Sequence, residues 1–184
     1  VLENAYVKGN AVISDDAEIS GYARGIGCAK VRENALISGE VSIEDNAIIE
    51  ANVVVRDKCR IMEFAVVTGD VHVSGKCKIG GRSYTYGKAD ISGEVEISGN
   101  AVVGGHVHIG DFVIVRDKAM IKEHASIHGH CLISGNAKII GYSDVDYDVG
   151  GLNIINASLA DRKKDIQPFF KQKFIEVLKK EESY

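Results

Sequence analysis

Small and branched aliphatic residues recur along this chain with a period of six. Residues 4–147 divide into 24 blocks of six with no insertion, and the fourth position of a block is Ile or Val in 22 of them. The exceptions are Gly25 and Thr85, while the second position is always Ala, Val, Cys or Ser. Because side chains alternate between the two faces of a strand, the second and fourth positions share a face. We expect that face to be buried.

The sixth position of each block predicts a turn. It is Gly in 14 blocks and Asp or Glu in eight. Gly adopts a positive φ without steric cost, and acidic residues with a following Asn are common in turns. A short strand and a corner in every block predict a solenoid in which three consecutive blocks close one coil. The 24 blocks then make eight coils, stacked about 4.8 Å apart.

The inward positions also follow a pattern in which an aliphatic residue is followed, in the next block, by a small one. Examples are Ile13 with Ala17 and Ile37 with Val41. In this pattern the chain resembles the hexapeptide-repeat superfamily over about four-fifths of its length. The resemblance implies an all-β solenoid, a left-handed parallel β-helix, which is an exception to right-handed crossovers. A right-handed β-helix is the alternative, although its coils usually vary in length and these blocks do not.

The six-residue phase is lost after Tyr147, where Gly150 and Gly151 mark a break. We therefore expect a β-helix domain over residues 1–156 and a C-terminal α-helix within residues 157–184. Pro168 suits the first turn of that helix. Apolar residues then recur at helical spacing, at Phe170, Phe174, Val177 and Leu178. Such a helix would cap the exposed end of the last coil, or alternatively dock onto a neighbouring subunit.

Charge and composition exclude several classes of protein. Lys and Arg total 22 against 26 for Asp and Glu, so no basic surface is available for nucleic acid. No apolar run approaches the ~20 residues that span a bilayer, so we expect no membrane segment. Cys59 and Cys77 are three blocks apart and would stack, which makes a disulfide conceivable, but their spacing matches neither a zinc knuckle nor a CxxC motif. Reduced thiols and a cytoplasmic location are the expectation.

Outward positions that are three blocks apart should form columns along the solenoid. One column on the second face is apolar apart from Lys30 and Lys138, with further aromatic residues beside it. A contiguous outward apolar patch usually marks an interface, and closed symmetry would bury it. We expect a homo-oligomer, most simply the homotrimer that the resemblance implies. The expected interface consists of Val12, Ile48, Phe64, Val66, Tyr84, Tyr86, Val102 and Met120.

The six histidines fall on the third face of each coil or at its corners. His106 and His124 are three blocks apart and should be stacked neighbours at one corner, with His108 on the same strand as His106. Three imidazoles with converging nitrogens would suit zinc, which at catalytic sites keeps three protein ligands and an open position. The alternative is that these histidines are exposed corner residues without a ligand.

Three functions are compatible with this sequence. The first is a rigid oligomeric scaffold or macromolecule-binding protein, with protein rather than nucleic acid as its partner, that needs no cofactor and has no catalytic activity. The resemblance implies a second, an acyltransferase that uses coenzyme A and His106 or His124 as a general base. The third is a zinc site like that of γ-class carbonic anhydrases, although the histidine intervals of this chain differ from theirs. Fold alone does not choose between them.

Overall fold

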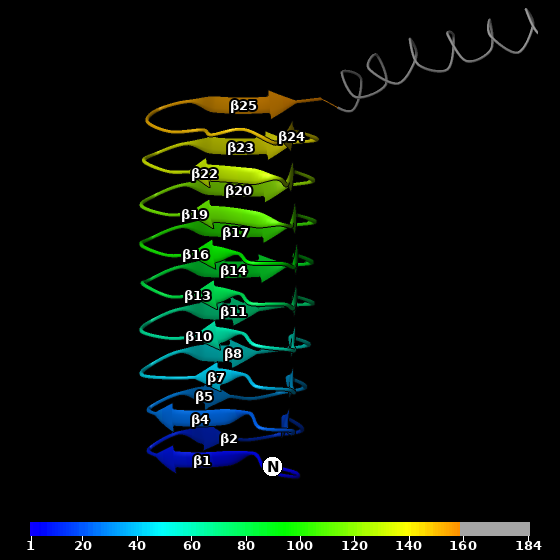
Figure 1. Ribbon diagram of the computed structural model, residues 1–184, viewed down its shortest axis with the longest axis vertical. Coiled ribbons are helices and arrows are strands. Elements are labelled where there is room, and N and C mark those ends of the chain that lie inside the picture. Colours follow the sequence, from blue (N-terminus) through cyan, green and yellow to red (C-terminus); the bar gives the residue numbers. More distant parts are fainter. Residues whose placement is uncertain (159–184) are drawn as a thin grey trace, which may run out of the picture.

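A short strand repeats in every block of six, and strands of successive coils pair in parallel (Figure 1). They form three sheets, one on each side of the solenoid. The computed structural model describes residues 1–158. Sheet 1 contains β1 (Tyr6–Gly9), β4 (Arg24–Gly27), β7 (Ser42–Ile43), β10 (Arg60–Ile61), β13 (Lys78–Ile79), β16 (Glu96–Ile97), β19 (Phe112–Val115) and β22 (His130–Ile133). Sheet 2 contains β2 (Val12–Ile13), β5 (Lys30–Val31), β8 (Ile48–Glu50), β11 (Val66–Thr68), β14 (Tyr84–Gly87), β17 (Val102–Gly105), β20 (Met120–Glu123), β23 (Lys138–Gly141) and β25 (Ile154–Ala157). Sheet 3 contains β3 (Glu18–Ile19), β6 (Leu36–Ile37), β9 (Val54–Val55), β12 (His72–Val73), β15 (Asp90–Ile91), β18 (His108–Ile109), β21 (Ser126–Ile127) and β24 (Asp144–Val145).

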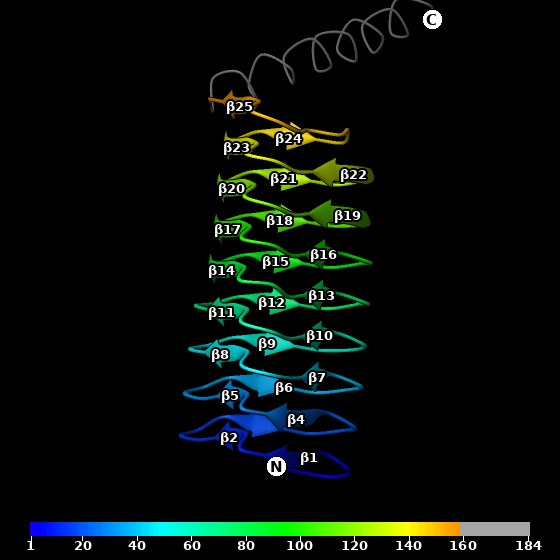
Figure 2. The ribbon, with the colours of Figure 1, turned by 90° about the vertical axis from the view of Figure 1, so that its left-hand side faces the viewer.

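The coils wind in the left-handed sense. In Figure 1 the strands of sheet 1 run leftward in front and those of sheet 2 run rightward behind them, while the chain rises from its N-terminus. Figure 2 shows the same coils from the side, with sheet 1 and sheet 2 on opposite edges and sheet 3 between them. Strand partners are three blocks apart in sequence, as in the pairs Val66 with Tyr84 and His72 with Asp90. The predicted eight-coil left-handed β-helix is confirmed.

The second and fourth positions of the blocks form one continuous core. From Ile19 to Val145 every one of these residues is buried, which confirms the inward face expected from the sequence. The first coil is the exception, because no coil within the described chain covers its outer side. Val7 there is 37% exposed. Burial thus follows the six-residue repeat wherever a coil has neighbours on both sides.

The corners adopt the conformation that the sixth position predicts. Every sixth position from Gly9 to Gly141 has a positive φ, including one alanine, Ala51 at 68°. The acidic corner residues make a further contact that was not predicted from the sequence, since their carboxylates accept a hydrogen bond from a backbone N–H of the next coil. The acceptors are Glu3, Asp15, Asp45, Asp57, Glu63, Asp111 and Asp117. Acidic corners therefore tie consecutive coils together as well as turning the chain.

The four cysteines are free thiols, and three of them lie in the core. The Sγ atoms of Cys59, Cys77 and Cys131 lie 2.9–3.0 Å from the carbonyl oxygens at the preceding corner, to which the thiols donate. Hydrogen bonding to Cys77 and burial both raise the pKa of the Cys59 thiol. Burial likewise raises the pKa of the Cys131 thiol. The three cysteines fill the small inward position of their blocks.

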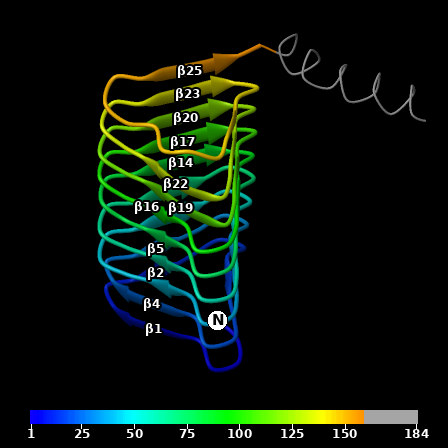
Figure 3. The ribbon, with the colours of Figure 1, turned by 45° about the horizontal axis from the view of Figure 1, so that its top comes forward.

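The repeat changes length at the C-terminal end of the described chain. Strand β25 pairs with β23 in the register Lys138 with Ile154, a shorter separation in sequence than the other strand pairs have. Figure 3 shows β25 closing this end of sheet 2. Of the segment 157–184, in which the helix is expected, the structure describes only residues 157 and 158, and Ala157 ends β25. The rest of the expected helix lies outside the described residues. Within the described chain, no helix is long and apolar enough to cross a membrane.

Candidate functional site

Two of the predicted site histidines stack at the corner between sheet 2 and sheet 3. The ring centroids of His106 and His124 are 5.0 Å apart, and the ring planes differ by 22°. Each residue opens a block directly after a positive-φ corner, Gly105 or Glu123, which directs both side chains outward from the same edge. The expected stacked pair is therefore present, and both rings are exposed.

Tyr142 extends this pair into a stack of three rings. Its ring centroid lies 4.6 Å from that of His124, with an angle of 8° between the planes. His124 is thus held between two rings, and its nitrogens remain at the ring edge. Tyr142 was not predicted from the sequence, although its place three blocks after His124 was the signal that could have found it. We call His106, His124 and Tyr142 the corner stack.

The third histidine of the proposed metal triangle makes a different contact. The Nδ1 atom of His108 lies 3.7 Å from an Oδ2 of Asp90, its neighbour in sheet 3. Within residues 1–158 no group of three or more His, Cys, Asp or Glu side chains is arranged to hold a metal ion. Zinc binding by His106, His108 and His124 stays a prediction.

The apolar column predicted on the second face lies on sheet 2. Its members occupy equivalent positions in strands of that sheet, with Lys30 between the first two, and we call the set Val12, Ile48, Val66, Tyr84, Val102 and Met120 the apolar column. Val12 and Tyr84 are exposed, and the others are half-buried. The corner stack lies at the sheet 3 edge of the same sheet. An interface along the column stays a prediction.

Aromatic side chains on and near β14 extend the apolar surface beside the column. Tyr84 and Tyr86 stack with centroids 5.1 Å apart, and the guanidinium carbon of Arg82 lies 5.8 Å from the centre of the Phe64 ring. The ring of Tyr86 lies over Gly104, where a Cβ atom would come within 2.1 Å of it. Phe64 and Tyr86, which the sequence placed in the interface, therefore lie beside the apolar column as expected.

Comparison with solved structures identifies the architecture. The UDP-N-acetylglucosamine acyltransferase of Campylobacter jejuni is similar with a TM-score of 0.51 and 18% identity over 78% of this chain. This chain spans 62% of the length of that protein. The chain has the hexapeptide-repeat fold. A UDP-N-acetylglucosamine acyltransferase from Francisella novicida matches at 18% identity with a TM-score of 0.37, covering 82% of this chain and 68% of its own.

Sequence comparisons give no further information on family or function, since no protein-family model and no curated protein matches the chain. At 18% identity the similarity to the Campylobacter enzyme shows the fold alone. The chemistry of this chain must therefore be argued from its own side chains.

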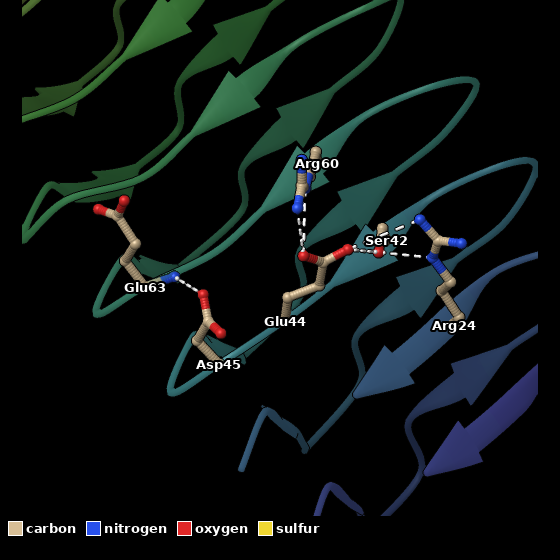
Figure 4. A network of polar contacts seen from close by, with 6 residues as sticks. All are labelled: Arg24, Ser42, Glu44, Asp45, Arg60 and Glu63. Atoms are coloured by element: carbon tan, nitrogen blue, oxygen red, sulfur yellow. Dashed lines mark hydrogen bonds and ion pairs between the residues drawn. The ribbon is translucent and has the colours of Figure 1, made fainter. Parts of the chain in front are cut away.

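A polar network on sheet 1 of the hexapeptide-repeat fold connects charges of the N-terminal coils (Figure 4). A carboxylate oxygen of Glu44 lies 2.5 Å from an Nη2 of Arg60 and another accepts a hydrogen bond from Ser42, whose Oγ also accepts one from Nε of Arg24. Partial burial raises the pKa of the Glu44 carboxyl, but the hydrogen bonds from Arg60 and Ser42 and the charges of Arg60 and Arg24 outweigh it. The net pKa lies below the usual value.

The lowered pKa of Glu44 predicts a pH-dependent contribution to stability. Replacing Glu44 by Gln is expected to lower the free energy of unfolding by about 1 kcal/mol at neutral pH, the upper end for a partly exposed ion pair. The wild-type advantage is complete above the ordinary glutamate pKa near 4.5 and is lost as the pH falls through the lower folded pKa. Urea unfolding between pH 7 and pH 3 measures this difference.

Glu40 provides the matched control for Glu44. Its carboxylate lies 3.5 Å from Nζ of Lys58, and both side chains are more than half exposed. Replacing Glu40 by Gln should change stability by only about 0.3 kcal/mol at any pH. An equal loss for the Glu44 variant at both pH values would contradict the electrostatic account and indicate lost packing.

Proposed function

We propose that this chain is an acyltransferase in which a histidine of the corner stack acts as a general base. The corner stack is the observation that carries the proposal, because it fixes two exposed imidazoles at the edge of an apolar face. Imidazole is the side chain most often used to accept a proton in a transition state. The similarity of the fold to a UDP-N-acetylglucosamine acyltransferase supports this choice over a purely structural role.

His124 is the better candidate for the base. Its ring is packed on one side by His106 and on the other by Tyr142, at centroid distances of 5.0 and 4.6 Å. Packing on both faces opposes rotation of the ring about its Cβ–Cγ bond, so its nitrogens keep one direction. A base that is already oriented loses less entropy when the acceptor binds. His106 has this packing on one face only.

The proposed reaction needs one proton transfer from the acceptor. The imidazole of His124 removes the proton from an acceptor hydroxyl or amine as that atom bonds to the carbonyl carbon of an acyl thioester. The carbon–sulfur bond then breaks, and the proton passes to the departing thiolate. Coenzyme A or an acyl-carrier protein is the thioester class that the hexapeptide-repeat fold suggests.

A homotrimer would complete this site. An outward apolar column of this length is typical of an interface, and a second copy packed along sheet 2 would bury it. The corner stack would then border the junction of two copies, where a cleft for the acyl donor could form. The three-fold arrangement is the simplest closed assembly for such a contact, and it is part of the proposal.

The test measures release of free coenzyme A from acetyl-coenzyme A by chromatography, with a panel of amine and hydroxyl acceptors. Replacing His124 by Ala should lower the rate about 10²–10⁴-fold, the usual contribution of a general base. Replacing His130 by Ala, an exposed histidine of sheet 1 outside the stack, should leave it unchanged. Light scattering of the same samples should give three times the chain mass of 19.8 kDa.

A non-catalytic scaffold is the second candidate. It is favoured by the solenoid itself, because no block between residues 4 and 147 carries an insertion that could shape an acceptor pocket. A stable trimer that releases no coenzyme A with any acceptor would support the scaffold and overturn acyl transfer. A monomer would remove the proposed junction and with it the site.

A further inference from the structure

Two adjoining depressions lie on the outer surface of sheet 3. Their lining residues come from earlier coils than the residues of the corner stack. One has a volume of about 300 Å³ and extends toward β12, and the other, of about 150 Å³, extends toward β6. Val54 and Arg56 line both. We call the pair the sheet 3 groove, and its lining residues are Glu18, Ser20, Leu36, Ile37, Ser38, Val54, Arg56, His72, Val73 and Ser74.

The groove exists because one long side chain stands in a column of short ones. Arg56 occupies the fifth position of its block, and the equivalent residues of the coils before and after it are Ser38 and Ser74. Coils are about 4.8 Å apart, so each serine is the immediate neighbour of the arginine stem. The hydroxymethyl groups fill little space on either side, and the guanidinium is left with open volume above and below it.

The charge of Arg56 has no counterpart in the described chain. No carboxylate of residues 1–158 lies within 4.0 Å of its guanidinium, whereas Arg24, Arg32 and Arg60 each have a glutamate within that distance. The acid next to it, Asp57, accepts a hydrogen bond from the N–H of Gly75 at 2.9 Å. An unpaired guanidinium in a depression is therefore free to bind an oxyanion through two parallel N–H donors.

One carboxylate, Glu18, lines the smaller depression, but it lies on β3, two strands from β9 in sheet 3, and not within 4.0 Å of the Arg56 guanidinium. The other acids near the groove have partners of their own. Glu40, across the corner, lies 3.5 Å from Nζ of Lys58. Asp90, the register partner of His72, lies 3.7 Å from Nδ1 of His108. Both carboxylates thus face partners other than Arg56. The groove also offers an anion further hydrogen-bond donors besides the guanidinium. These are the imidazole of His72 and the hydroxyls of Ser38 and Ser74.

The floor of the groove beside Arg56 is apolar. Val54 lies on the same face of the chain just before Arg56, and Leu36 is its register partner in β6. Leu36 is 45% exposed, which leaves aliphatic surface uncovered next to the guanidinium. Ligand sites commonly combine apolar lining with a few placed polar groups. A ligand with a charged end and a short aliphatic part would cover both kinds of surface.

We propose that the sheet 3 groove binds a small organic oxyanion with a short aliphatic group. Its carboxylate or phosphate end binds the guanidinium of Arg56 between the hydroxyls of Ser38 and Ser74. Its aliphatic part lies on Val54 and Leu36. This site goes beyond the proposed acyl transfer, since it shares no residue with the corner stack and would exist equally in a scaffold. Because the groove is open, we expect dissociation constants of about 1 mM.

The test titrates the full chain with butyrate, acetate and inorganic phosphate at constant pH and ionic strength, following the NMR signals of the Arg56 side chain and the Ser74 amide. Butyrate is expected to bind saturably and about fivefold more tightly than acetate, because two further CH₂ groups reach the apolar floor. Replacing Arg56 by Gln should weaken butyrate binding at least about tenfold. Replacing Ser74 by Leu, which fills the larger depression, should have the same effect.

Arg32 is the matched control. It occupies the fifth position of a block in sheet 2, but its guanidinium is hydrogen-bonded to Glu50, with Nε 2.8 Å from the carboxylate. Replacing Arg32 by Gln removes the same charge and should change butyrate binding less than about twofold. Equal weakening in the Arg32 and Arg56 variants would show general electrostatics and overturn the site. So would the absence of saturable shifts, or phosphate binding without any preference for butyrate over acetate.

Discussion

Replacing Gly81 by Ala is expected to lower the free energy of unfolding by about 2–4 kcal/mol, the sum of a conformational cost and a steric one. Gly81 is a corner residue with a φ of +70°, a conformation that costs an L-residue about 1–2 kcal/mol. Its Cβ would also lie 2.5 Å from the carbonyl oxygen and 2.6 Å from the nitrogen of Gly99 in the next coil. Because that carbonyl accepts the N–H of Arg82, the two coils cannot separate without losing a hydrogen bond. Equilibrium urea denaturation measures the loss.

Gly151 separates the two contributions to this effect. It has nearly the same φ, +69°, but no described atom lies within 4 Å of the position of its Cβ. Replacing Gly151 by Ala should therefore cost only about 1 kcal/mol, the conformational part alone. Equal losses in the two variants would contradict the close approach of consecutive coils at Gly81.

Replacing Thr85 by Val is expected to raise the free energy of unfolding by about 1–3 kcal/mol, the cost of burying an unpaired hydroxyl. The side chain is fully buried, and its hydroxyl has no hydrogen-bond partner within the described chain. Valine has the same shape, and the register partners of Thr85 in the coils on either side, Val67 and Val103, are valines already. Thermal and urea unfolding should both show the gain.

Thr68 is the control for Thr85. It lies at the end of β11 in the same sheet, with its side chain on the outward face and half-buried. Replacing Thr68 by Val should change the free energy of unfolding by less than about 0.5 kcal/mol. Destabilisation of the Thr85 variant would mean that its hydroxyl is satisfied in solution, and the unpaired-hydroxyl account would be wrong.

The fold could be predicted from the sequence because each block of six carries the same information. Ile37 and Val41 occupy positions that alternate correctly for burial, and the corner glycines and acids accept a positive φ. These are local requirements, and every coil repeats them. The columns of outward residues then follow, so the stack of His106 on His124 was also predictable from their separation alone.

Other features depend on what neighbouring coils do to each other, and they were not predicted from the sequence. The carboxylate of Asp57 binds an amide one coil away, a contact that depends on its rotamer as well as on its position. The open space around Arg56 depends on the size of its two neighbours in the column, and these are far away in sequence. Tyr142 was missed because the prediction of the corner rested on histidines and on no other rings.

The constant spacing of three blocks between neighbouring strands also has a consequence for how such a chain can change during evolution. Consider deleting or duplicating one whole coil outside the corner stack and the sheet 3 groove. Every remaining side chain would return to an equivalent column, so both surfaces would survive intact on a shorter or longer rod. Deleting a single block would keep the core but move each later residue onto the next face. The length of the chain can therefore change by whole coils without loss of either surface. A change of one or two blocks would rearrange both the corner stack and the sheet 3 groove.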